Sequence, residues 1–288
     1  MSGFNGGLIG KDNLTAATDS IPGVWTLKEQ EIGIRTSRWV GLGGLLDTYP
    51  AALAYSLRTL RAEMATSPVV RVRRSNDNSE QDFTSSQITD GTLASFCGAN
   101  SGFVRTWYDQ SGNSNHAVQT TAAAQPRIVT AGVIDAEAGK PAIVWPSVNH
   151  GLSFMLRMTT VRTYILLARC SNTLLGDRPF LLGDSTEYQY HAGNGTWLDS
   201  NYSPPSVRNG DNRLNGVSAN FATTARSPIR YIFTMINTAN APASSLMFDR
   251  GNGRSWVGPV QEVIIYTTDQ GANRAAIETN INAHYSVF

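Results

Sequence analysis

The chain has 288 residues, of which 41% are hydrophobic and 9% aromatic, with a net charge of +1. Disordered chains usually combine high net charge with few aromatic residues, so this composition indicates a folded protein. The near-zero charge also argues against nucleic-acid binding, which needs a concentrated basic face. Only 16% of residues are charged, against about 25% in typical soluble domains, which favours a neutral polar surface.

The N-terminal residues lack the basic and apolar regions of a signal peptide, and no apolar run approaches the roughly 18 residues of a membrane span. We therefore expect a protein made in the cytoplasm, without membrane insertion. Cys97 and Cys170 do not have the spacing of a zinc site or a redox pair, and we expect buried thiols rather than a disulfide.

Residues 1–45 are predicted to form an extended, glycine-rich arm. Large apolar side chains are scattered through it, among them Phe4, Ile9, Trp25 and Trp39. The glycines deny these side chains a core of their own, so they need another surface to bury against. We expect the arm to tether the protein to a neighbouring subunit, with packing against its own domain as the open alternative.

The segment after the arm has a helical pattern. Leu53, Leu57, Leu60 and Met64 fall at helical spacing after a capping Asp47 or Thr48. We expect one helix from Asp47 to about Thr66.

The rest of the chain, completing a domain over residues 46–288, reads as short strands separated by turns. The predicted strands are Val69–Arg74, Phe103–Tyr108, Ala142–Trp145, Thr163–Ala168, Ile229–Ile236, Ser245–Phe248 and Val260–Tyr266. Ile229–Ile236 is apolar on both faces and therefore predicted to be central. Short helices are expected at Asp90–Cys97 and after Asp269. Many short strands with few helices favour an all-β sandwich or barrel.

Two runs carry a family resemblance: Val70–Asn78 and, above all, Trp107–His116 with its Tyr-Asp-Gln-Ser-Gly sequence. They occur in the order found in the catalytic domain of α-L-arabinofuranosidase B, glycoside hydrolase family 54, which the chain resembles from about Asp47 to Phe288. The resemblance implies a concanavalin A-like jelly-roll β-sandwich with a few peripheral helices. A similar domain, preceded by a glycine-rich arm like residues 4–27, occurs in bacteriophage structural proteins.

The resemblance also implies positions for catalysis. Retaining glycosidases need two carboxylates about 5–5.5 Å apart. Asp249 matches the place of the family's acid/base, and Ala192–Trp197 matches the segment before its nucleophile. Asp199, one methylene shorter, stands where the family has a glutamate, and the family's adjacent cysteine pair is absent. Asp249 and Asp199 are therefore vestigial catalytic candidates.

The same segment predicts a sugar-binding site. Trp197 would offer a stacking platform, and Asn194, Asp199, Tyr190 and Asp249 the surrounding contacts. The alternative, left open, is that the aromatic residues belong to the core.

Two further sets of oxygen-bearing residues allow structural explanations. Asp109, before Gln110-Ser111-Gly112, is expected to form an Asx-turn rather than to act in catalysis. Asn76, Asp77 and Asp82 lie in an oxygen-rich loop that could hold Ca²⁺ or simply be hydrated. No other cofactor is expected.

From these observations we expect a non-catalytic bacteriophage virion structural protein, either a head decoration or a tail component. Its partners would be other virion proteins, further copies of itself in a homo-oligomer, and glycans. An active α-L-arabinofuranosidase-type glycoside hydrolase is the alternative, and a free-standing carbohydrate-binding module is the third.

Overall fold

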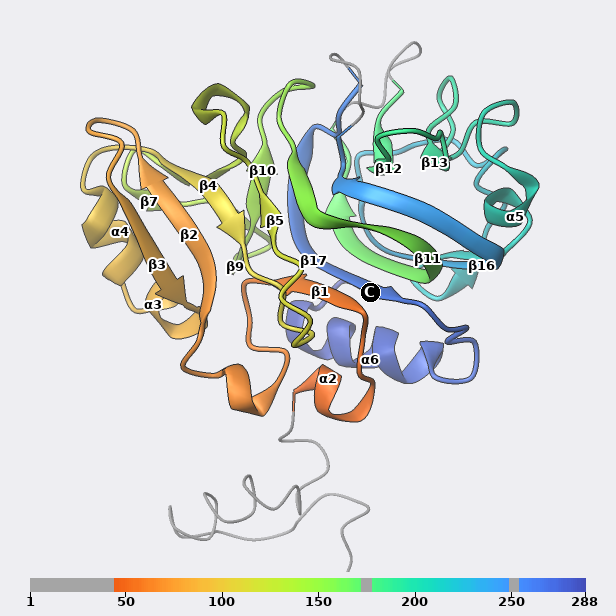
Figure 1. Ribbon diagram of the computed structural model, residues 1–288, viewed down its shortest axis with the longest axis horizontal. Helices are drawn as coiled ribbons and strands as arrows, with labels where there is room; N and C mark the ends of the chain where they lie inside the picture. The colour runs from red at the N-terminus through yellow and green to blue at the C-terminus, as the bar shows by residue number, and fades with distance from the viewer. Residues whose placement is uncertain (1–43, 172–177, 249–253) are drawn as a thin grey trace, which may run out of the picture.

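A computed structural model describes residues 44–171, 178–248 and 254–288 (Figure 1). The predicted arm, with Phe4, Ile9, Trp25 and Trp39, lies outside the described residues, as does Asp249.

Strands make up most of the described regular structure. In chain order they are β1 (Leu53–Ser56), β2 (Pro68–Arg74), β3 (Glu80–Thr84), β4 (Gly102–Trp107), β5 (Ala117–Val118), β6 (Arg127–Thr130), β7 (Val133–Ile134), β8 (Ala136–Glu137), β9 (Lys140–Pro141), β10 (Ile143–Trp145), β11 (Leu152–Arg169), β12 (Phe180–Leu182), β13 (Tyr190–His191), β14 (Asp211–Leu214), β15 (Val217–Ser218), β16 (Arg230–Leu246) and β17 (Gly258–Tyr266). The helical segments are α2 (Leu45–Thr48), η2 (Ala62–Met64), α3 (Ser85–Thr89), α4 (Thr92–Cys97), η3 (Ala122–Ala124), α5 (Pro205–Arg208) and α6 (Arg274–Tyr285).

The main sheet folds over itself because the long strand β11 changes neighbours along its length. The N-terminal part of β11 pairs with β5 at Ser153 and Phe154, whereas its C-terminal part pairs with β17 from Thr163 to Ala168. The path β17-β10-β6-β4-β5-β11 is thereby closed by the β11–β17 pairing. The result is an all-β fold with a sandwich-like or barrel-like sheet and few helices.

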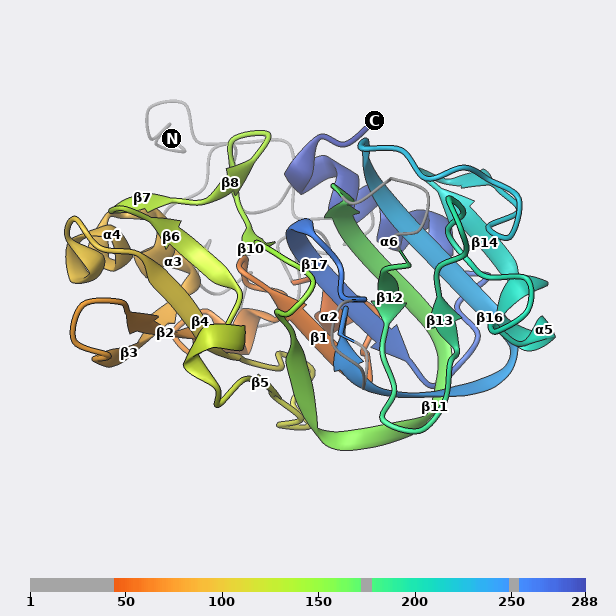
Figure 2. The same ribbon diagram turned by 90° about the horizontal axis from the view of Figure 1, so that it is seen from above.

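The central strands are buried on both faces, as their apolar sequences predict. Along β11, Tyr164 and Leu166 enter the larger core, while Ile165 and Leu167 enter a second cluster that includes Ile277 and Ile281 of α6. Figures 1 and 2 show α6 on one side of this region and the hairpin of β12 and β13 on the other. The two apolar clusters therefore share one sheet, and the prediction of a central strand at Ile229–Ile236 is confirmed by β16.

The predicted helix from Asp47 to Thr66 is wrong. Leu53–Ser56 forms strand β1, which pairs with Ile265–Glu262 of β17, between the short segments α2 and η2. The reason is that side chains from another part of the chain form hydrogen bonds with the backbone of this segment. Asp109 Oδ1 accepts the Ala54 N–H at 2.9 Å, and Gln110 accepts the Leu60 N–H and donates to the Ser56 and Arg58 carbonyls. These bonds replace those that a helix would make internally.

Several other sequence predictions are confirmed. Most predicted strands fall within β2, β4, β10, β11, β16 and β17, although Ser245 and Leu246 belong to the end of β16 rather than to a separate strand. The two predicted helices correspond to α4 and α6. Cys97 and Cys170 are buried thiols without a disulfide between them. No helix in the described part is long and apolar enough to cross a membrane.

Candidate functional site

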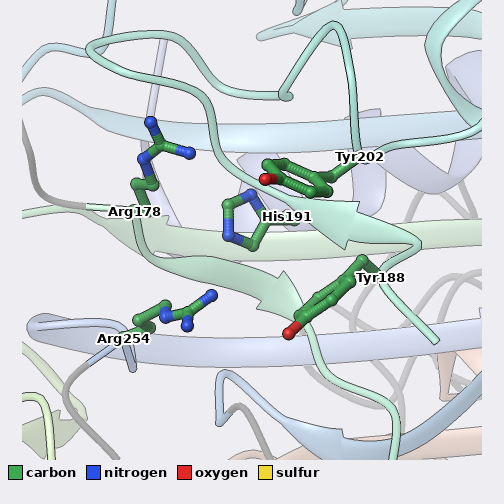
Figure 3. A pocket seen from close by; sticks show the side chains of 5 residues that line it. All are labelled: Arg178, Tyr188, His191, Tyr202 and Arg254. Atoms are coloured by element: carbon green, nitrogen blue, oxygen red, sulfur yellow. The ribbon is translucent and has the colours of Figure 1, made fainter. Parts of the chain in front are cut away.

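A pocket of about 370 Å³ lies beside the β12–β13 hairpin. Its wall consists of Arg178, Tyr188, His191, Tyr202 and Arg254, whose side chains surround one space in Figure 3. The volume falls within the range of small-molecule sites, about 300–1,000 Å³. Concavity, aromatic faces and cationic groups together make this pocket the candidate site.

Aromatic packing fixes His191 at the base of the pocket. Its ring meets Phe180 edge-on at a centroid distance of 4.6 Å, and Tyr188 and Tyr202 at 5.6 Å and 5.5 Å. The pairing of Phe180 with His191 across β12 and β13 sets this arrangement, because paired residues on neighbouring strands share a face. Tyr202 remains 54% exposed, so part of its face is open to a ligand.

Asp199 is held close to the pocket by its own turn. Its Oδ1 accepts the N–H groups of Asn201 at 2.7 Å and Tyr202 at 3.1 Å. Its Oδ2 lies 3.6 Å from Nη1 of Arg178. Its N–H donates to the His191 carbonyl at 2.8 Å, which ties the turn to β13.

His191 is uncharged at neutral pH. Burial lowers the pKa of the imidazole to about 4, and the positive charges of Arg254 and Arg178 act in the same direction, against the opposing effect of Asp199. Only 1% of the residue is exposed, and its Nδ1 has no hydrogen-bond partner among the described residues.

The structure separates the residues that the sequence grouped into a sugar site. Asp199 lies beside the pocket, and Asn194 is exposed in a turn. Trp197 is fully buried against Phe233, at 4.8 Å between centroids, so it cannot serve as a stacking platform. Tyr190 is also buried, and its hydroxyl accepts a hydrogen bond from Asn237. For these two aromatic residues the core alternative is correct, because both side chains face the sheet.

The sequence reasoning missed the two arginines of the pocket. Arg178 and Arg254 each follow a segment with turn-forming residues, Gly176-Asp177 and Gly251-Asn252-Gly253. Neither belongs to a recognisable motif. The only available signal was a basic residue directly after a glycine-containing stretch of sequence in an otherwise weakly charged chain.

The carboxylates of the candidate calcium loop are engaged by arginines. Asp77 pairs with Arg74, which lowers the pKa of the carboxyl well below its usual range. Asp82 pairs with Arg71 at 2.9 Å. Asn76 is exposed. Within the described ranges, no group of three or more His, Cys, Asp or Glu residues is arranged to hold a metal ion.

Asp109 is structural, as its sequence context predicts. It is only 2% exposed, and its two oxygens accept the N–H groups of Ala54, Ser111 and Asn115 and the Ser111 hydroxyl.

Comparisons with known proteins identify the fold. The class is a closed, mostly antiparallel β-sheet fold. Two solved structures share it: an arabinofuranosidase complexed with arabinofuranosyl-α-1,2-xylobiose (TM-score 0.55, 16% identity), and a mutant of a glycoside hydrolase family 54 α-L-arabinofuranosidase soaked with 4-nitrophenyl α-L-arabinofuranoside (TM-score 0.50, 15% identity). The match covers 83% of this chain and 65% of each of those chains, so this chain spans less than two thirds of their length.

No protein-family model and no curated protein sequence matches the chain. The prediction of a non-catalytic bacteriophage virion protein is wrong, because the solved structures that share the fold are glycoside hydrolases. That prediction relied on a loose glycine-rich pattern in the arm and on the missing nucleophilic glutamate. The resemblance to family 54 is confirmed at the level of the fold.

Proposed function

We propose that this chain is an α-L-arabinofuranosidase-type glycoside hydrolase that binds a sugar in the pocket around His191. The observation that carries the proposal is a pocket on an arabinofuranosidase-like fold, next to the segment that resembles the sugar-pocket segment of that family. Tyr202 offers a partly exposed ring for stacking against a sugar, and the neighbouring polar groups offer hydrogen bonds. We further assign the fold to the concanavalin A-like jelly rolls.

The chemistry requires two carboxyl groups with different roles. Asp199 is our candidate nucleophile, because it stands at the position of the family's nucleophile segment and its Oδ2 lies 3.6 Å from Nη1 of the pocket residue Arg178. Asp249 is our candidate acid/base by its resemblance to the family position, and it lies five residues before the pocket residue Arg254 in the sequence.

Hydrolysis of 4-nitrophenyl α-L-arabinofuranoside tests this assignment. We expect release of nitrophenol, and a loss of at least about 100-fold in kcat/KM for Asp249→Asn and for Asp199→Asn, because each removes a reacting acid. Asp269→Asn is the matched control, since Asp269 is an exposed aspartate outside the pocket wall. Unchanged activity of Asp249→Asn would exclude the proposed acid/base.

One observation favours a second function, carbohydrate binding without cleavage. The Oδ1 of Asp199 accepts two backbone N–H groups in its own turn, the same use of a carboxylate as at Asp109. A carboxylate held in this way is common in structural turns. Saturable binding of L-arabinose by calorimetry, without hydrolysis of the aryl furanoside, would favour this second function.

A further inference from the structure

Two arginines converge on the uncharged imidazole of His191. In Figure 3, Arg178 and Arg254 lie on one side of His191, and Tyr188 and Tyr202 lie on the other side. Both guanidinium charges act on the ring strongly enough to help keep it neutral. One wall of the pocket is therefore cationic, and the opposite wall is aromatic.

The acidic partner of Arg178 is held less tightly than those of Arg157 and Arg169. Arg157 pairs with Asp184 through two hydrogen bonds of 2.9 Å and 3.0 Å, and Arg169 pairs with Glu137 through bonds of 2.9 Å and 3.1 Å. The shortest contact between Arg178 and Asp199 is 3.6 Å, and one oxygen of Asp199 already accepts two N–H groups. Charge-assisted hydrogen bonds are normally about 2.7–2.9 Å long.

A guanidinium group has five N–H donors and can therefore keep one partner while donating to another. Its planar fork matches the two oxygens of a carboxylate. His191 is only 1% exposed and its Nδ1 is fully buried, so the accessible cationic groups of this wall are the two arginines.

We propose that the pocket binds a saccharide that carries a carboxylate, a uronic acid unit, with the carboxylate at Arg178 and Arg254 and the sugar ring against Tyr188 and Tyr202. The inference rests on the proposed function in placing a sugar in this pocket. It goes further in stating that the sugar is negatively charged, which the comparisons with arabinofuranosidases do not indicate.

Binding to the full chain tests the inference, with D-galacturonate and its neutral counterpart D-galactose titrated separately by calorimetry at low ionic strength. We expect galacturonate to bind at least tenfold more tightly, and its affinity to fall as sodium chloride is added, because the added ions screen the partly exposed arginine. Arg254→Gln and Arg178→Gln should each weaken galacturonate at least tenfold, and should weaken galactose by a much smaller factor, because only galacturonate carries the carboxylate that pairs with a guanidinium group.

Arg162→Gln is the matched control, because Arg162 is a partly exposed arginine paired with Asp269 outside the pocket wall. Thermal unfolding of each variant separates lost binding from lost folding, and Arg254→Lys, which keeps the charge, should retain part of the affinity.

Equal affinity for galacturonate and galactose, or an unchanged affinity in folded Arg254→Gln, would overturn the inference. Tighter binding of galactose 6-sulfate than of galacturonate would overturn the assignment of a carboxylate and indicate a pocket for a sulfated sugar. If the chain hydrolyses the neutral aryl arabinofuranoside but shows no preference for galacturonate, only this inference fails. If galacturonate binds and the arabinofuranoside is not hydrolysed, only the proposed hydrolase activity fails.

Discussion

The side chain of Asp109 shows how one carboxylate can determine the path of a distant segment. It accepts hydrogen bonds from Ala54, Ser111 and Asn115, so it joins β1 to the turn after β4. The sequence around it is the most specific part of the resemblance to the arabinofuranosidases. In the structure both oxygens of this carboxylate accept hydrogen bonds within the junction.

Replacing Asp109 by alanine should therefore destabilise the protein without altering the pocket. We expect a loss of about 3 kcal/mol in the free energy of unfolding, because buried N–H groups lose their acceptor. Urea denaturation measures it, and Asp135→Ala, at a less buried aspartate, is the comparison and should cost less. A change below about 1 kcal/mol for Asp109→Ala would contradict the structural role.

His191 should make the stability depend on pH. Its pKa in the folded protein, about 4, lies below the usual value of 6.5, so the unfolded chain binds more protons between these pH values. The free energy of unfolding should therefore rise as the pH increases from about 4 to 6.5. In His191→Gln this contribution is absent, and we expect a pH dependence weaker by on the order of 1–3 kcal/mol over that window. Equal pH profiles of the two proteins would contradict the assignment.

At the scale of elements, a buried ion pair holds the end of β1 against β17. Glu262 is only 1% exposed and accepts two hydrogen bonds from Arg58, at 2.7 Å and 2.8 Å, and one from the Ser56 hydroxyl. Asn280 of α6 accepts another N–H of Arg58. One arginine thus connects a strand, its neighbour in the sheet and the C-terminal helix.

Arg58→Met should cost about 3–5 kcal/mol in the free energy of unfolding, because it leaves Glu262 buried without a counter-charge. The double variant Arg58→Met/Glu262→Gln should recover part of that loss, since the buried charge is then absent. Chemical denaturation of both single variants and the double variant gives the coupling energy. Additive losses would indicate that the pair does not act as a unit.

At the scale of the whole molecule, the described domain contains both apolar clusters on the two faces of one sheet. We therefore expect residues 44–288 to fold cooperatively without the N-terminal segment. The arm at residues 1–45 stays a prediction, and we propose that it mediates self-association.

Light scattering of the full chain and of residues 44–288 tests this proposal. The full chain should be oligomeric and the shorter chain a monomer with an unchanged near-ultraviolet circular dichroism spectrum. A monomeric full chain would exclude self-association through the arm.

The sequence predicted the fold class and most strands because alternation and apolar runs are local signals. It failed at Leu53–Ser56, where the helical spacing of the leucines is overridden by hydrogen bonds to residues fifty or more positions away, such as Asp109 and Gln110. That competition has no local signature. The sequence correctly predicted a structural turn at Asp109, because the residues that follow it, Gln110-Ser111-Gly112, are typical of such turns.

The candidate site was predicted only in part. The stretch from Tyr188 to Tyr202 was identified by its aromatic and polar composition, and it does supply three residues of the pocket wall. The sequence left open whether Trp197 is a stacking platform or part of the core, because a buried and an exposed tryptophan look alike in sequence. Arg178 and Arg254 come from segments far apart in the chain, and only the folded sheet brings them to one space.

The last residue of β11, Arg169, lies directly opposite the first residue of β16, Arg230. The chain from 170 to 229, which carries β12, β13 and most of the pocket, thus departs and returns at adjacent points of the framework. We expect such an insertion to be exchangeable between domains of this fold, provided that the replacement covers Tyr164 and Phe233 with an equivalent apolar layer and restores the pairing of β14 with β16. Ligand preference in proteins of this architecture can therefore diverge by exchange of a single cassette while the scaffold is inherited unchanged.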